Sequence, residues 1–113
     1  MTHFTIDEFT CKCGCGRNNI DPDFLRMLDI ARSIAGVPFI INSGCRCPEH
    51  NKAVGSTSDN HIEGHAADIK ALNGYMRMRI LSGLVKAGFK RIGIHKTFIH
   101  ADNMDKTESC WVY

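Results

Sequence analysis

Apolar residues recur at three- and four-residue steps between positions 21 and 35, which is the spacing of one face of an α-helix. The residues that form this stripe are Phe24, Leu25, Leu28, Ala31, Ile34 and Ala35. Asp21 suits the N-cap, Pro22 the first helical position and Gly36 the C-terminal stop. The pattern predicts a helix from Asp21-Pro22 to about Ala35, with its apolar stripe in the core.

Shorter apolar runs predict a small sheet and a second helix. Strands are expected at residues 37–41, 66–71, 89–95 and 97–101, the last two close enough to form a hairpin. The second helix is expected at residues 75–87, because Asn73 can begin it and Gly88 can stop it. The paired terminal strands favour an α+β fold, a small antiparallel sheet with flanking helices, over a doubly wound sheet.

A long polar segment separates the first two predicted strands. Residues 45–60 are rich in Gly, Ser, Asn, Asp and Pro, which predicts a loop with at most one helical turn around residues 49–54. Loops of this length in a small domain usually carry function. We therefore expect part of any functional site to come from this segment.

Length and composition indicate one globular domain spanning residues 1–113. The hydrophobic fraction of 43% and the charged fraction of 23% are typical of such domains. The formal charge of +2 is small and the basic residues are dispersed, so neither a nucleic-acid partner nor a membrane-binding face is expected. No stretch approaches the ~20 apolar residues of a membrane span. We expect a monomer.

The first residues lack the basic start and apolar run of a signal peptide, since Met1 is followed by a mixed segment with acids at Asp7 and Glu8. The expected location at synthesis is therefore the cytoplasm. Six cysteines are present, with Cys11, Cys13 and Cys15 close together. Cysteines two apart in an extended segment point the same way. A structural metal site, disulfides and free thiols all remain open for them.

The segment from Asp59 to Asp68 holds the residues with the clearest chemistry. A catalytic zinc ion takes three protein ligands and leaves a fourth position open, and His61 and Asp68 can supply two of them. Strand alternation places Asp68 on one face, with Ala67 and Ile69 on the other. If the strand that contains His100 is its neighbour, His100 can complete the set.

Three motifs in this order resemble the zinc D-Ala-D-Ala carboxypeptidase family. They are Ser43-Gly-Cys-Arg-Cys-Pro-Glu-His-Asn51, His61-x-x-Gly-x-Ala-x-Asp68 and Phe98-Ile-His-x-Asp102. That family includes bacterial wall carboxypeptidases and phage L-alanyl-D-glutamate endolysins, and its fold is shared with the hedgehog signalling domain. The resemblance covers most of the chain and implies a zinc peptidase that acts on peptidoglycan stem peptides.

The resemblance also implies roles for single residues. It implies zinc on His61, Asp68 and His100, with Arg46 as a residue that anchors the substrate or polarises its carbonyl. A guanidinium can grip a carboxylate with two hydrogen bonds or stabilise an oxyanion. A salt bridge to a nearby acid such as Glu49 is the alternative for Arg46. The bond cleaved is D-Ala-D-Ala or L-Ala-D-Glu, and the protein would reach the wall after release or within a phage particle.

The sequence departs from the family where an acidic general base is usual, because Thr97 stands three residues before His100. Asp102 is the first candidate for the base, being predicted on the same face as His100. Its alternative role is to orient a metal-bound histidine. His95 is the second candidate. Because of Thr97, a catalytically inactive, zinc-stabilised binding or structural module is the rival hypothesis.

Overall fold

A five-stranded sheet lies at the centre of the computed structural model, which describes residues 3–56 and 58–113. Three residues lie outside the described ranges: Met1, Thr2 and Thr57. All three belong to the predicted domain, and Thr57 also belongs to the predicted loop. The strands are β1 (Ile41–Ser43), β2 (Ala66–Lys70), β3 (Arg91–Ile94), β4 (Phe98–Asp102) and β5 (Ser109–Val112). Their order in the sheet is β1-β2-β4-β3-β5, and only the β3–β5 pair is parallel.

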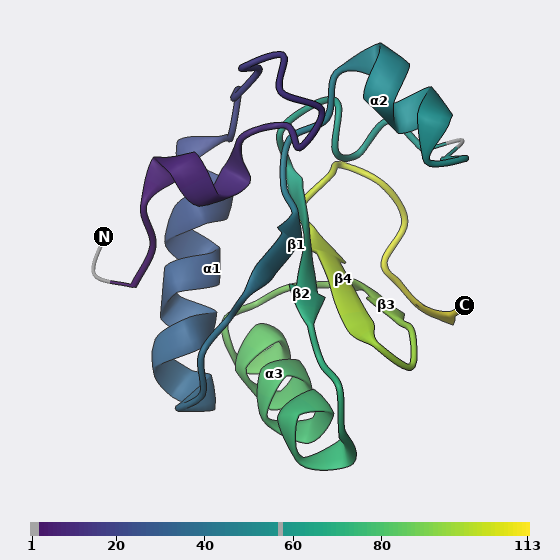
Figure 1. Ribbon diagram of the computed structural model, residues 1–113. Helices are drawn as coiled ribbons and strands as arrows, with labels where there is room; N and C mark the ends of the chain where they lie inside the picture. Colours follow the sequence, from purple (N-terminus) through teal and green to yellow (C-terminus); the bar gives the residue numbers. More distant parts are fainter. Residues whose placement is uncertain (1–2, 57) are drawn as a thin grey trace.

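Helices α1 (Pro22–Ala35) and α3 (Gly74–Lys86) pack against each other beside the sheet (Figure 1). Both begin as the sequence predicts, because the side chains of Asp21 and Asn73 accept hydrogen bonds from backbone N–H groups of their first turns. Gly36 ends α1 in the left-handed conformation. The predicted α+β fold with flanking helices is confirmed.

The two faces of the strand pair β2 and β4 differ in character: one packs in the hydrophobic core and the other carries polar side chains. Ile69 of β2 lies opposite Ile99 of β4, and both are fully buried in the core formed with the helices. Asp68 and His100, also direct partners, alternate with them and project to the opposite face. Side-chain alternation therefore separates a hydrophobic face from a polar one on the same two strands.

Several elements differ from the sequence prediction. The first strand begins at Ile41 rather than at residue 37, because Pro38 has no N–H to give to a sheet and residues 37–40 approach as irregular chain. The predicted helical turn is the six-residue helix α2 (Pro48–Ala53). A 3₁₀ turn, η1 (Ile6–Phe9), and strand β5 were not predicted. Strand β5 is largely exposed and lacks an alternating apolar pattern.

The cysteine-rich segment is a turn and not the extended run predicted from the sequence. Gly14 and Gly16 have φ angles of 89° and 83°, a left-handed conformation that glycine adopts without steric cost. The chain therefore curls, and the thiols of this segment converge through a turn instead of aligning along a strand. Among the described helices, none combines the length and the apolar character needed to cross a bilayer.

The contact between α1 and α3 depends on Gly83, which lies against the backbone of Ala31. A Cβ at this position would collide with the Ala31 carbonyl oxygen, so Gly83→Ala should destabilise the fold by about 1–3 kcal/mol, as other overpacked cores do. Gly74→Ala in the same helix is the matched control, because its added Cβ meets nothing within 4 Å. Urea unfolding measures both. Equal stability of the two variants would contradict the close helix contact.

Candidate metal centre and active site

The structure brings together the three residues predicted to bind metal. Asp68 on β2 and His100 on β4 are cross-strand partners, and His61 comes from the turn that precedes β2. His61 Nε2 lies 3.4 Å and His100 Nδ1 3.0 Å from Asp68 Oδ1. One ligand atom from each residue lies within 4.8 Å of the other two, and all three residues are buried. These atoms surround one point.

Hydrogen bonds fix the orientation of both imidazole rings. His61 Nδ1 lies 2.7 Å from the Gly44 carbonyl oxygen, which can only accept, so Nδ1 donates and Nε2 keeps its lone pair. His100 Nε2 lies 2.7 Å from the carboxylate of Asp102, so it donates there and leaves Nδ1 directed at Asp68. The assignment follows from the bonding partners. Both free lone pairs therefore face the same point as Asp68 Oδ1.

The electrostatics of the three residues favour a cation between them. Burial raises the pKa of Asp68, but hydrogen bonds and charges from His100 and His61 outweigh it and hold that pKa well below its usual range. Burial lowers the pKa of His100, but Asp102 and Asp68 outweigh it and raise that pKa. Two imidazole nitrogens and one carboxylate oxygen are ligands that zinc prefers. The residues present therefore fit a zinc ion, whose binding would displace a proton.

Arg46 lies beside this centre and holds the carboxylate of Asp68. Its guanidinium donates to Ser43 Oγ at 3.0 Å, to Asn51 Oδ1 at 3.2 Å and to Asp68 Oδ2 at 3.2 Å. Arg46 does form a salt bridge to an acid, but that acid is Asp68 and not Glu49, the example predicted from the sequence. A guanidinium has five N–H donors, so Arg46 retains donors beyond these three contacts for a ligand.

Asp102 is placed behind His100 and its oxygens are fully engaged. Oδ2 accepts from His100 Nε2 and Asn60 Nδ2, and Oδ1 accepts from Arg91 Nε and the Met104 N–H. The residue is 1% exposed. Burial raises the pKa of Asp102, but these donors outweigh it and lower that pKa. Such contacts favour the orienting role over the general-base role, which stays a prediction.

His95, the second candidate base, lies at the turn between β3 and β4. Its ring stacks on Phe98 with centroids 4.6 Å apart, and its Nδ1 accepts from the Thr97 N–H at 3.1 Å. A neutral ring with Nδ1 occupied in this way carries its proton on Nε2, where it donates and does not accept. The contacts of Nδ1 thus favour a ring that donates from Nε2, whereas a general base must accept a proton. The base role of His95 also stays a prediction.

A pocket of about 590 Å³ opens over the centre. Arg46, His61, Asp68 and His100 line it on one side, and Phe98, Trp111 and Tyr113 form an aromatic wall. Trp111 lies across Gly93, where a larger side chain would collide with the indole, and its ring is 5.3 Å from that of His100. The pocket is thus polar at the three candidate metal ligands and apolar at one wall.

The two pocket residues at the C-terminal end, Trp111 in β5 and Tyr113 directly after it, were not predicted from the sequence. They alternate with Val112, which is the one signal that could have placed them together. Arg91, which contacts both Asp102 and the Trp111 ring, was also missed. Its neighbours come from distant segments, so no local pattern marks it. Asp59, at the start of the segment that carries His61 and Asp68, pairs with Lys106 at the surface.

Comparisons with known proteins gave a family match and a structural match. The profile of the Peptidase M15 family matches residues 2–102. The crystal structure of Serratia marcescens L-Ala D-Glu endopeptidase ChiX has a similar fold, with a TM-score of 0.51 and 20% sequence identity over 75% of this chain and 80% of that chain. A comparison with curated proteins found no match. Because the family profile spans His61, Asp68, His100 and nearly the whole chain, this protein belongs to the peptidase M15 family.

Proposed function

We propose that this protein is a zinc-dependent peptidase that hydrolyses peptide bonds in the stem peptides of bacterial peptidoglycan. The observation that carries the proposal is the convergence of His61 Nε2, Asp68 Oδ1 and His100 Nδ1 at the side of an open pocket. Membership of the peptidase M15 family supports the peptidase activity. Three protein ligands beside an open space are the arrangement of a catalytic site, whereas structural zinc sites are closed by four.

The chain's own residues prepare this centre for hydrolysis. When bound, zinc supplies a Lewis acid that activates water and polarises a peptide carbonyl. Gly44 and Asp102 hold the two imidazole rings with their lone pairs inward, and Arg46 holds Asp68 from the other side. Arg46 also lines the pocket, and its remaining donors are suited to a carbonyl oxygen or a carboxylate. Arg46 is therefore proposed to bind the substrate as well as to position Asp68.

The pocket also supports a choice between the two candidate bonds. Stem peptides carry the free carboxylate of D-glutamate, and Arg46 and Arg91 supply positive charge at the pocket. Phe98, Trp111 and Tyr113 offer an apolar wall for the small alkyl side chains of the peptide. Together with the fold of the Serratia L-Ala D-Glu endopeptidase, these features favour the L-Ala-D-Glu bond over D-Ala-D-Ala. Delivery to the wall after release or within a phage particle belongs to this proposal.

A catalytically inactive binding module is the second candidate function. Two observations favour it: Thr97 is not an acid, and the contacts of Asp102 and His95 do not suit a general base. Such a module would keep the zinc site and bind stem peptides through the same pocket. Turnover separates the two candidates, because binding alone releases no peptide.

Purified peptidoglycan, incubated with the zinc-loaded protein, should release peptides with new termini. Mass spectrometry of the products identifies the bond, and we expect new N-terminal D-glutamate from cleavage after L-alanine. New C-terminal D-alanine with loss of one residue would indicate the carboxypeptidase activity instead. Binding to peptidoglycan without any released peptide, at full zinc occupancy, would favour the inactive module.

His61→Ala should remove the proposed catalytic zinc, because it deletes one of three ligands. His65→Ala is the matched control: it lies on the same segment, but its ring contacts Asn103 at 2.8 Å and not the metal centre. Elemental analysis after dialysis should find one zinc ion fewer per chain in His61→Ala and no loss in His65→Ala. Equal zinc in both variants would contradict the ligand assignment.

Asp102→Asn distinguishes the two roles of this residue. If Asp102 orients His100, zinc affinity should fall about 10- to 100-fold and turnover should recover with added zinc. If Asp102 is the general base, zinc affinity should persist and turnover should fall by roughly a hundredfold or more. The contacts on all sides of the carboxylate favour the first result. Measuring zinc affinity and turnover at saturating zinc resolves the two roles.

A further inference from the structure

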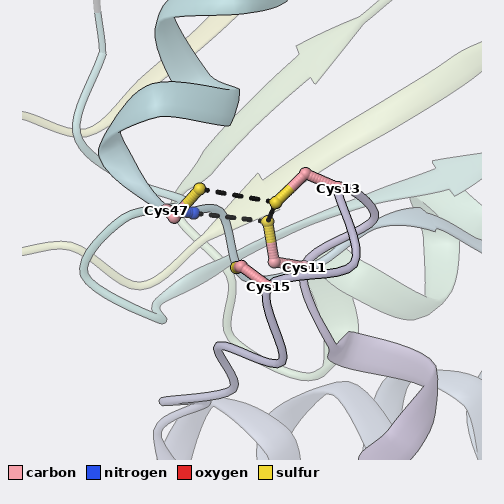
Figure 2. Close-up of side chains that lie close together, drawn as sticks. All are labelled: Cys11, Cys13, Cys15 and Cys47. Atoms are coloured by element: carbon pink, nitrogen blue, oxygen red, sulfur yellow. Dashed lines mark hydrogen bonds between the residues drawn. The ribbon is translucent and has the colours of Figure 1, made fainter.

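Four cysteines gather at a second place in the molecule, away from the three metal-binding residues described above. Cys11, Cys13 and Cys15 from the N-terminal turn face Cys47 at the start of α2, and we call these four residues the thiol cluster (Figure 2). One sulfur atom from each lies within 4.8 Å of the other three. Cys11 and Cys47 are buried, and Cys13 and Cys15 are exposed. The cluster is therefore anchored in the protein and open to solvent on one side.

The distances between the sulfur atoms suit a tetrahedral metal ion. Cys13 Sγ lies 3.5 Å from Cys11 Sγ and 3.6 Å from Cys47 Sγ. Zinc binds thiolate sulfur at about 2.3 Å, so the edge of a tetrahedral four-sulfur site is about 3.8 Å. A disulfide needs its two sulfur atoms about 2.05 Å apart, and it would use two of the four thiols. Four sulfur atoms around one point match the metal site better than any pairing.

We propose that the thiol cluster is a second metal site of this protein, a structural tetrathiolate that binds one zinc ion. Structural zinc sites are closed by four ligands and often consist of four cysteines. The site differs in kind from the His61, Asp68 and His100 centre, which provides three ligands and an open pocket. The sequence left metal, disulfide and free thiols open for these residues, and the folded arrangement favours the metal.

The backbone around the cluster is arranged to support thiolate ligands. The Cys47 N–H donates to Cys11 Sγ at 3.4 Å, and the His50 N–H donates to Cys47 Sγ at 3.3 Å (Figure 2 draws the first). Such N–H groups stabilise negative sulfur and orient it, as the outer contacts of other metal ligands do. The left-handed Gly14 and Gly16 allow the tight turn that returns Cys13 and Cys15 to Cys11.

The metal would tie the N-terminal segment to the loop that carries Arg46. Cys47 directly follows Arg46, and the Cys45 N–H donates to the Phe9 carbonyl at 2.8 Å, so the two segments already run together. A zinc ion bound by the thiol cluster would hold these two segments together without the need for extensive hydrophobic packing between them. We assign the site a stabilising role. By holding the loop that carries Arg46, it would also help to position Arg46 in the pocket.

Metal content and spectroscopy test the proposal on the whole chain. Wild-type protein should carry two zinc ions, and the double variant Cys13→Ser, Cys15→Ser should carry one fewer. Cys110→Ser is the matched control, since Cys110 is exposed on β5 and outside the cluster. His61→Ala should keep the cluster zinc. After cobalt replaces zinc, thiolate-to-cobalt charge-transfer absorption should appear in wild type, Cys110→Ser and His61→Ala, and should disappear in the double variant.

A chelator should lower the melting temperature of His61→Ala, because that variant retains only the cluster metal. The triple variant Cys13→Ser, Cys15→Ser, His61→Ala has neither metal, so a chelator should leave its melting temperature unchanged. The cobalt spectrum of the wild type keeps the test valid if the double variant does not fold. The proposal is overturned by full zinc content in a folded double variant, by iron in place of zinc, by lack of thiolate absorption in wild type, or by disulfides found on thiol counting of the denatured, unreduced protein. Loss of peptidase activity alone would bear on the proposed function and not on this site.

Discussion

The antiparallel pairing of β2 with β4 is the constraint on which the candidate metal centre depends. It places Asp68 opposite His100 and, one residue further, Ile69 opposite Ile99. A slip of one residue would exchange the two faces, burying the polar pair in the core and exposing the isoleucines. The hydrophobic contact of Ile69 and Ile99 with the helices therefore fixes the register. Packing in the hydrophobic core therefore determines the geometry of the candidate ligands, although none of these ligands belongs to that core.

That register also determines which charged groups are buried together. Asp102 lies two residues beyond His100 on the same face of β4, and its carboxylate is hydrogen-bonded to the His100 ring. Because this carboxylate is buried, its negative charge needs an opposite charge and hydrogen-bond donors around it. Arg91 supplies the opposite charge, and Asn60 and the Met104 N–H supply further hydrogen bonds, so the donors come from three separate segments. The network stabilises a carboxylate that would otherwise be costly to bury, and the same contacts orient His100. Stability and ligand alignment thus depend on one set of hydrogen bonds.

Much of this arrangement could be predicted from the sequence, because its signals are local. The helix caps at Asp21 and Asn73 and the alternation around Asp68 each depend on a few neighbouring residues. The parts that were missed depend on distant contacts. Strand β5 forms by parallel pairing with β3, and its exposed residues show no apolar pattern. The ion pair of Arg46 with Asp68 joins residues 22 positions apart, which sequence spacing does not reveal.

The segment from Gly44 to Cys47 connects the two groups of possible metal ligands. The Gly44 carbonyl accepts from His61, and Arg46 holds Asp68, while Cys47 belongs to the thiol cluster. Gly44 is itself packed against the backbone of Phe9, where an added Cβ would lie 2.7 Å from Phe9 Cα, so this segment cannot move without moving the N-terminal turn. Residues of one short segment therefore contact both groups of candidate ligands. Any force that displaces the thiol cluster reaches His61 and Asp68 through a few covalent bonds and two hydrogen bonds.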